Sequence, residues 1–214
     1  MTTTPTRRRL NRAEKRAANR TRLLEAAVRV FAERGYQAAS VQEIAEESGL
    51  SNGALYYNFD SKQQLFLALM DDRTAARIAE LEATFGPTAA SGSGTEHDIR
   101  RLTGRDSSAA GERREWTLLF EFLAHSTRDP LFRRRFRARV HSMRRALAVA
   151  VGRRAGEEGT RLTLPVEQAA AAIQALGWGV AAQRLADPAG LPDDFLGTLV
   201  IALLKGLTQD QAAA

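Results

Sequence analysis

The chain has 214 residues, of which 44% are hydrophobic, and it carries a formal net charge of +6 with no cysteine. The lack of cysteine excludes disulfides, thiolate metal sites and a cysteine nucleophile. No apolar run approaches the roughly 18–20 residues that span a bilayer, and the first ten residues lack the hydrophobic segment of a secretory signal, so we expect a cytoplasmic protein without a membrane partner.

The excess positive charge is concentrated in an N-terminal basic arm, residues 1–22. This arm contains eight lysines and arginines against one acid, Glu14, whereas the rest of the chain is nearly neutral. Such a cluster can be a solubilising tail. It can also follow DNA phosphates or enter a minor groove, where it gains affinity from the release of counterions. The sequence leaves both interpretations open.

The first helix is expected from about Arg12 to Gly35. Its apolar side chains recur at helical spacing on one face, at Leu24, Ala27, Val28 and Phe31. This face predicts the core of a small helical domain, and Gly35 marks the exit from the helix because glycine accepts the backbone conformations that end one.

The segment 40–62 has the pattern of a helix-turn-helix. Ser40 and Glu43 can form a capping box at the start of one helix. Gly49 stands where that helix must end, and Ser51 can cap a second, very short helix. A helix, a glycine turn and a short helix with a small polar start are typical of DNA-binding helix-turn-helix domains.

This segment resembles the DNA-binding domain of the TetR/AcrR family of bacterial transcriptional repressors. The residues that match the family pattern are Ser40, Ile44, Ala45, Gly49, Leu50, Ser51, Gly53, Tyr56, Phe59, Ser61, Lys62 and Leu65. So many matches at fixed spacing are a specific signal. Two positions depart from the family: Asn58 where histidine is common, and Asn52 where lysine or arginine is frequent. The second departure removes a phosphate-binding cation and could alter the operator preference.

The resemblance implies which residues of this segment would contact DNA. Ser40, Ser51 and Lys62 would hold phosphates. The residues that would face bases or backbone are Asn52, Ala54, Tyr56 and Tyr57. Gly53 would let the backbone come close to the DNA. For Tyr56, partial packing in the core is the alternative.

A longer helix is expected to begin at Lys62 and to end before Gly86. By resemblance, this helix transmits ligand-driven movement to the DNA-binding domain. The segment Pro87–Thr95 that follows is small and polar, which predicts a flexible loop, most simply a plain connector.

The rest of the chain shows helical spacing and no strand pattern. After a weak helix around Ile99 and Leu102, the expected helices cover 112–127, 130–155, 165–187 and 192–208. The last two look too apolar for the surface of a monomer, and a homodimer interface would bury them. In the family, the last two helices of each subunit form a four-helix bundle.

One face of the expected 130–155 helix is rich in arginine. These residues are Arg133, Arg134, Arg135, Arg137, Arg139, Arg144 and Arg145. They could form a second nucleic-acid surface. A solvated face is the simpler interpretation, because arginine favours helices and its stem covers apolar surface.

The resemblance also implies a small-molecule effector bound in the second domain. Candidate pocket residues are Trp116, Phe120, Leu123, Phe136, Met143, Gln174 and Trp178. For each of them core packing is the simpler explanation, since aromatic residues at helical spacing usually pack. The histidines, His97, His125 and His141, lack the spacing of metal ligands, so we expect no metal and no other cofactor.

The sequence therefore predicts an all-α protein of about nine helices. A helix-turn-helix domain would cover 12–62, and an effector-binding and dimerisation domain would cover 63–214. We expect a transcriptional regulator, by default a repressor, that binds a palindromic double-stranded DNA operator as a dimer and is released by an effector. A ligand-independent dimeric DNA-binding protein is the alternative, which a cavity in the second domain would disfavour. No hydrolase, phosphate-loop, dinucleotide or zinc-protease motif supports an enzyme.

Overall fold

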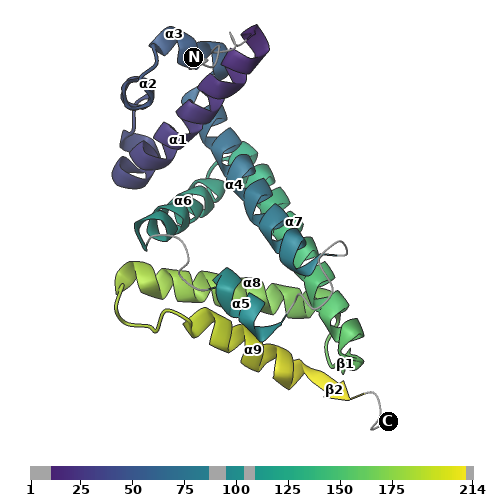
Figure 1. Cartoon of the computed structure of the whole chain (residues 1–214). Coiled ribbons are helices and arrows are strands. Elements are labelled where there is room, and N and C mark those ends of the chain that lie inside the picture. The colour runs from purple at the N-terminus through teal and green to yellow at the C-terminus, as the bar shows by residue number, and fades with distance from the viewer. Residues whose placement is uncertain (1–10, 87–94, 104–108, 211–214) are drawn as a thin grey trace, which may run out of the picture. The chain divides into compact units, whose positions relative to one another are not determined.

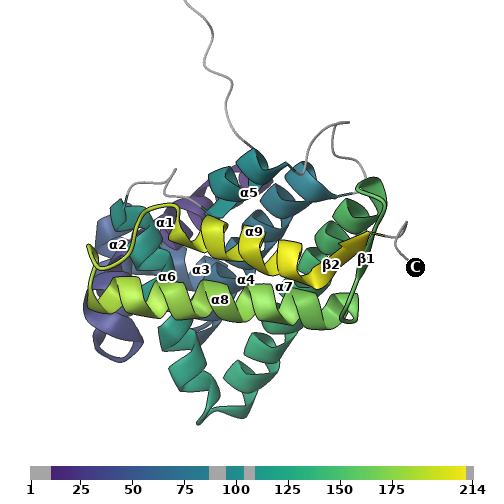
Figure 2. The ribbon, with the colours of Figure 1, turned by 90° about the horizontal axis from the view of Figure 1, so that it is seen from below.

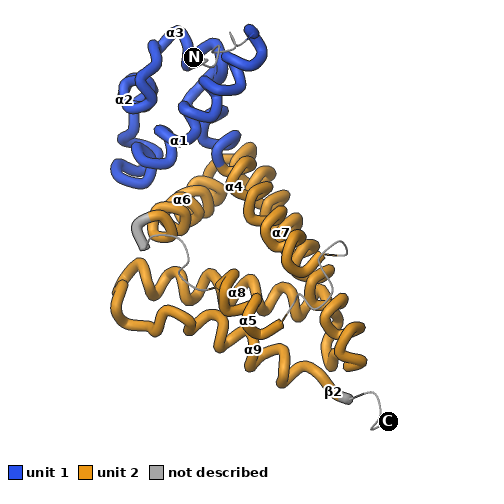
Figure 3. The backbone as a smooth tube through the Cα atoms, in the orientation of Figure 1, with its two compact units in different colours: residues 1–69 blue, residues 70–214 orange. Residues whose placement is uncertain are grey.

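The computed structural model describes residues 11–86, 95–103 and 109–210 of the chain (Figure 1). These residues form nine helices, as the all-α prediction requires, and one short β-ribbon, which was not predicted. The chain divides into two compact units, residues 1–69 and 70–214 (Figure 3). Residues 1–10 of the basic arm, which include Arg7, Arg8 and Arg9, lie outside the described residues, as does the predicted 87–95 loop apart from Thr95.

The N-terminal unit is built on helix α1 (Arg12–Ala38). A capping box opens this helix: the Glu14 amide donates to Asn11 Oδ1 at 2.8 Å, and the Asn11 amide donates to Glu14 Oε2 at 2.7 Å. Gly35 has a φ of 73° and interrupts the helical backbone three residues before α1 ends. The predicted exit at Gly35 therefore corresponds to this break.

Helices α2 (Val41–Ser48) and α3 (Asn52–Asn58) form the helix-turn-helix with the caps that the sequence indicates. The Glu43 amide donates to Ser40 Oγ at 3.1 Å, and the Glu43 carboxylate accepts from the Ser40 amide at 2.9 Å. That backbone hydrogen bond, helped by the Ser40 hydroxyl, lowers the pKa of the Glu43 carboxyl. Gly49 ends α2 at a φ of 65°, where a Cβ would be strained and would meet Arg22 Nη2 at 3.0 Å.

An aromatic cluster forms part of the core of the N-terminal unit. Phe66, from the start of α4 (Lys62–Phe85), packs edge-on against Phe31 and Tyr36, with ring centroids 5.2 and 4.9 Å apart. Leu55 is the fully buried residue of α3. Because so short a helix buries one large side chain inward, its neighbours on the other face remain available for contacts.

The second unit contains the remainder of α4 and five more helices. They are α5 (Glu96–Thr103), α6 (Ala109–Ser126), α7 (Pro130–Glu157), α8 (Val166–Ala186) and α9 (Phe195–Leu207). Helix α7 begins where Asp129 Oδ1 accepts hydrogen bonds from the amides of Leu131 and Phe132. Figure 2 shows α8 and α9 side by side along one face of this unit. None of the helices in the described part of the chain is long and apolar enough to cross a membrane.

A two-stranded ribbon joins the ends of α7 and α9, although the sequence shows no strand pattern. Strand β1 (Thr160–Leu162) pairs antiparallel with β2 (Thr208–Asp210), with Arg161 opposite Gln209. Strands of three residues are too short to show an alternating pattern, so the expectation of no strand was wrong here.

Helices α4 and α7 run parallel within the second unit. Arg139 of α7 donates to the Met70 carbonyl and to Thr74 Oγ1 of α4, whereas Arg153, fourteen residues later, donates to the Gly86 carbonyl. Both ends of the pair are therefore tied by guanidinium groups. Between these ties, α4, α5, α7, α8 and α9 bury a common core that includes Phe85, Ile99 and Leu204.

The arginine-rich face of α7 is only partly solvated. The exposed members are Arg133, Arg134, Arg135, Arg137 and Arg145. Arg139 and Arg144 are instead partly buried, and the Nε of Arg144 is a buried donor without a hydrogen-bond partner among the residues described. The prediction of a solvated face fails at these two positions because they turn toward neighbouring helices.

Candidate DNA-binding surface and ligand cavity

Helix α3 presents two tyrosines to solvent. Tyr56 is 55% exposed and Tyr57 is 69% exposed, although large aromatic side chains are usually covered. Asn52 and Gly53 are also exposed, and Ala54 is half-buried. Of the two interpretations of Tyr56, the exposure disfavours core packing. The surface of α3 thus carries aromatic rings and an amide, which are groups that can contact the base edges and the sugars of DNA.

Cationic side chains of α1 lie beside the aromatic rings of Tyr57 and Phe59. The guanidinium carbon of Arg16 is 5.2 Å from the centroid of the Tyr57 ring, and that of Arg20 is 5.6 Å from the centroid of Phe59. Both arginines are exposed. The described part of the basic arm therefore continues the α3 surface with positive charge, which favours a polyanion.

Ser40 and Ser51 are exposed helix caps. Their hydroxyl oxygens accept hydrogen bonds from the amides of Glu43 at 3.1 Å and Ala54 at 3.2 Å. Accepting a cap bond uses an oxygen lone pair and leaves the O–H free to donate. Ser51 can therefore cap α3 and donate to a phosphate at the same time, whereas the Ser40 hydroxyl also interacts with the Glu43 carboxylate.

Lys62 is already bound within the N-terminal unit. Its ammonium group donates to the carbonyl oxygens of Gln37 and Ala39, both at 3.0 Å, and lies 4.8 Å from the centroid of the Tyr36 ring. The family resemblance alone would assign this residue to phosphate. The geometry gives it a positioning role: it ties the first turn of α4 to the connection between α1 and α2.

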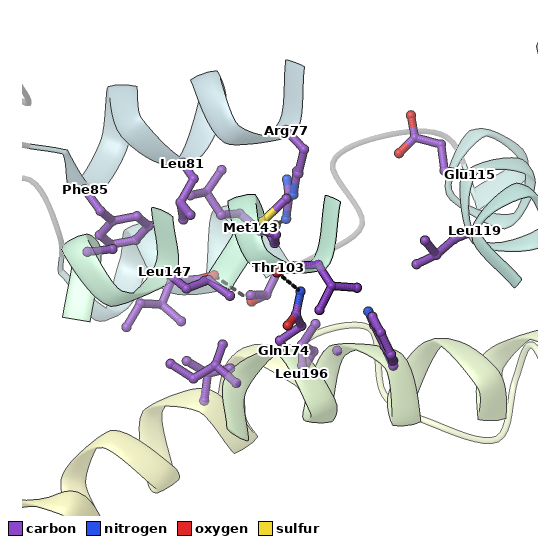
Figure 4. A pocket seen from close by; sticks show the side chains of 18 of the residues that line it. Arg77, Leu81, Phe85, Thr103, Glu115, Leu119, Met143, Leu147, Gln174 and Leu196 are labelled. Atoms are coloured by element: carbon purple, nitrogen blue, oxygen red, sulfur yellow. Dashed lines mark hydrogen bonds between the residues drawn. The ribbon is translucent and has the colours of Figure 1, made fainter. Parts of the chain in front are cut away.

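The second unit contains a cavity of about 290 Å³. Side chains from α4, α5, α6, α7, α8 and α9 line it, and most are apolar. In the view of Figure 4, Leu81, Phe85 and Leu147 lie on one side, Glu115 and Leu119 on the other, and Arg77 and Gln174 between them. A volume of a few hundred cubic ångströms is the size of small-molecule sites in proteins.

Four of the seven candidate pocket residues line this cavity: Trp116, Met143, Gln174 and Trp178. The other three are Phe120, Leu123 and Phe136, which are not among the lining side chains. Phe136 is buried against Phe122, with ring centroids 5.2 Å apart and nearly perpendicular planes. The ring of Phe120 lies 6.4 Å from that of Trp116. Helical spacing identifies a buried face but does not say which part of it borders a void.

The charged lining residues were not among the sequence candidates. Arg73 and Arg77 of α4 and Arg139 and Arg154 of α7 line the cavity, together with Glu112 and Glu115 of α6. A signal was present: Arg73 and Arg77 precede Leu81 and Phe85 at steps of four, so two arginines continue an apolar face of α4. Charged residues that continue the apolar face of a helix can therefore indicate a cavity lining.

The two cavity acids have cationic partners. Glu115 Oε1 lies 3.2 Å from Arg73 Nη1, and Glu112 Oε1 lies 3.2 Å from Arg184 Nη1. Arg184 also donates to the carbonyl groups of Pro192 and Asp193. In the part of the chain that the structure describes, no group of histidines and acids is arranged to hold a metal ion.

Two features together define a class of protein: a helix-turn-helix with an exposed second helix, and a separate helical unit with a cavity. This is the architecture of a ligand-binding transcriptional regulator. The model of the family "Bacterial regulatory proteins, tetR family" matches residues 23–69, and that of "BetI-type transcriptional repressor, C-terminal" matches residues 100–209. The chain belongs to the TetR family of transcriptional regulators.

Individual relatives agree with this assignment. The transcriptional repressor AcnR of Corynebacterium efficiens is 31% identical over 155 residues, which are 72% of this chain and 75% of AcnR. A structure from Saccharomonospora viridis, described as a transcriptional regulator in complex with choline, is 21% identical. It superimposes with a TM-score of 0.72 over 90% of this chain and 99% of that one. The SmeT–triclosan complex, 20% identical, gives 0.69 over 91% and 93%.

Replacing Lys62 by methionine is expected to weaken the N-terminal unit. The free energy of opening should fall by about 2–3 kcal/mol, because hydrogen bonds from a charged group contribute roughly 1.5–3 kcal/mol. Native-state hydrogen exchange of the α2 and α3 amides measures this change. Lys15→Met on exposed α1 is the matched control and should have no effect. Unchanged protection in Lys62→Met would show that Lys62 is not an anchor.

Proposed function

We propose that the protein is a repressor that binds a palindromic DNA operator as a homodimer and leaves it when a small-molecule effector occupies the cavity of the second unit. The observation that carries this proposal is the pairing of two features in one chain. In one unit, Tyr56 and Tyr57 are exposed and Tyr57 lies beside Arg16 of α1, and the other unit holds a mostly apolar cavity.

On DNA, the residues of the N-terminal unit would divide into two groups. Ser51 would donate to a phosphate through its O–H group, and Ser40 would do so by turning its O–H from the Glu43 carboxylate to the phosphate, with Arg16 and Arg20 adding positive charge. Asn52, Tyr56 and Tyr57 would face the bases of the major groove, where Gly53 allows close approach. Phosphate contacts position a protein and base contacts give sequence specificity. Lys62 would act on DNA chiefly by fixing the unit's geometry, with at most one N–H left for a phosphate.

The proposed dimer interface is the face that α8 and α9 present in Figure 2. Small residues are exposed along both helices: Ala175, Gly179, Ala182, Ala202 and Gly206. A Cβ added at Gly179 or at Gly206 would meet no atom within 4 Å. Such a surface lets another pair of helices approach closely. A two-fold axis would then place two α3 helices in major grooves one duplex turn apart, about 34–36 Å.

Release from DNA requires an effector that prefers the DNA-incompetent state. An effector that binds both states equally shifts nothing, however tightly it binds. The cavity supports an effector, and the choline and triclosan complexes are of proteins with this fold. A ligand-independent dimeric DNA-binding protein is the alternative function. It gives no reason for a cavity of about 290 Å³ at the centre of the second unit.

Tyr57→Ala is expected to weaken binding to the operator by about 1–3 kcal/mol, as for the loss of a base contact, and to leave binding to random duplex nearly unchanged. Fluorescence anisotropy with both duplexes at the same salt concentration measures the two effects. Tyr57→Phe, which keeps the ring, is the matched control. Equal losses on both duplexes would mean that Tyr57 contacts only the DNA backbone.

Ala182→Glu is expected to convert the dimer into monomers, because it would bury a charge in a helix–helix interface. Sedimentation velocity at micromolar concentration should then show the 23.4 kDa chain instead of a species of twice that mass. Ala138→Glu makes the same change at an exposed position of α7 and should remain dimeric. If both variants are dimers, the α8–α9 face is not the interface.

A further inference from the structure

We infer that the effector is an anionic amphiphile: a small molecule whose oxyanion head, such as a carboxylate, binds Arg139, Arg77 and Arg73, and whose apolar body lies along Leu81, Phe85 and Leu147. The inference rests on the proposed function, which supplies the effector, and it adds the chemical class. Its basis is the distribution of charge and apolar surface along the cavity wall.

Arg139 is a cation held inside the second unit without an anionic partner. Its guanidinium donates to the Met70 carbonyl and to Thr74 Oγ1, which are neutral acceptors. Burial lowers its pKa to about 10, although Glu115 and Asp71 partly oppose this shift, so it stays charged at neutral pH. Those two acids instead pair with Arg73 and Arg135. No carboxylate of the described residues lies within ion-pair distance of Arg139. A desolvated cation in this state gains most from an anion.

Arg73 and Arg77 bring two more guanidinium groups to the same part of the wall. They lie one turn apart on α4, and Arg139 contacts the α4 backbone at residue 70, one turn earlier. The Nε of Arg73 is a buried donor with no acceptor among the described residues. Arg77 donates to the Leu102 carbonyl and pairs with exposed Glu80. Of the acids that line the cavity, only Glu115 pairs with one of these three arginines, and Glu80 is not part of the lining, so donors remain for an oxyanion.

A cationic effector finds no carboxylate in the lining that is not already paired with a cation. The acids that line the cavity, Glu112 and Glu115, already pair with Arg184 and Arg73. A quaternary ammonium ion would have to compete with guanidinium groups for these carboxylates. It would also bring a fourth positive charge next to Arg73, Arg77 and Arg139. The choline complex of a relative with this fold therefore does not predict the ligand of this chain.

The wall becomes apolar away from the arginines. Since α4 and α7 run parallel, the lining residues of both helices change from charged to apolar in the same direction along the cavity. Arg73 and Arg77 are followed by Leu81 and Phe85 on α4, and Arg139 is followed by Met143, Leu147 and Val151 on α7. Arg154 also lines the cavity, beyond Val151, but its charge is paired with Glu158 at 2.8 Å. The part of the cavity around the three arginines therefore suits an anion, and the adjoining part, where Leu81, Phe85 and Leu147 lie on one side of Arg77 in Figure 4, suits hydrocarbon.

The test is isothermal titration calorimetry of the full chain, without DNA, with three ligands that share an eight-carbon chain. Octanoate is expected to bind one per chain, at least about tenfold more tightly than octan-1-ol and octyltrimethylammonium, since ionised hydrogen-bond pairs are the strong ones. Octyl phosphate should also bind more tightly than the alcohol if any oxyanion suffices. Inorganic phosphate alone should bind far more weakly than octyl phosphate, because it lacks the apolar body.

Variants connect the selectivity to the arginines. Arg139→Gln should reduce the advantage of octanoate over octan-1-ol to less than about threefold, and Arg139→Lys should retain part of it, because lysine keeps the charge but not the bidentate geometry. Arg134→Gln, an exposed arginine on the same helix, is the matched control and should change nothing. Because Arg139 also ties α7 to α4, Arg77→Gln provides a second variant, with a thermal melt to confirm folding for each.

Equal binding of the three ligands, tighter binding of the ammonium compound, or no binding of any of them would overturn the inference. So would full octanoate selectivity in folded Arg139→Gln and Arg77→Gln. The proposed function fails in a different way. If octanoate binds selectively in calorimetry and leaves operator affinity unchanged, the ligand class is correct and the release mechanism is wrong.

Discussion

The ammonium group of Lys62 holds the beginning of α4 against two backbone carbonyls, and the geometry of the DNA-binding unit depends on this tie. Gln37 and Ala39, which supply those carbonyls, border the α1–α2 connection, and Ala39 directly precedes the Ser40 cap. The same continuous helix later contributes Arg73, Arg77, Leu81 and Phe85 to the cavity wall. One helix therefore supplies both an anchor of the DNA-binding unit and the lining of the ligand cavity, as a coupling between ligand and DNA would require.

The helix-turn-helix was predictable because its signals are local. The capping box of Ser40 and Glu43, the left-handed Gly49 and the Ser51 cap each act within four residues, and each is present in the structure. The helices of the second unit were predictable from apolar spacing, and the beginning of α7 at Pro130 and of α8 directly after Pro165 followed from proline chemistry. The β1–β2 ribbon was not predictable, because it pairs two short segments that lie far apart in the sequence.

The candidate sites were predictable to a smaller extent. Exposure of Tyr56 and Tyr57 follows from the short α3, which buries Leu55 as its large inward residue. The role of Lys62 does not follow from its position in the motif, since its partners come from a different segment. Similarly, Arg139 reads as one of several arginines on a solvated helix until α4 is placed against α7. A cavity is defined by the packing of six helices, and no single segment of sequence encodes it.

The most direct test of the account is a binding titration of the protein against the promoter DNA that flanks its own gene, at two salt concentrations, with random duplex as the control. We expect the promoter DNA to bind at least about a thousandfold more tightly than random DNA, with two chains on a palindromic footprint. Equally tight and steeply salt-dependent binding to both duplexes would reduce the interaction to the charge of the basic arm. Failure to bind any DNA at low salt would contradict the central claim that this chain is a DNA-binding regulator.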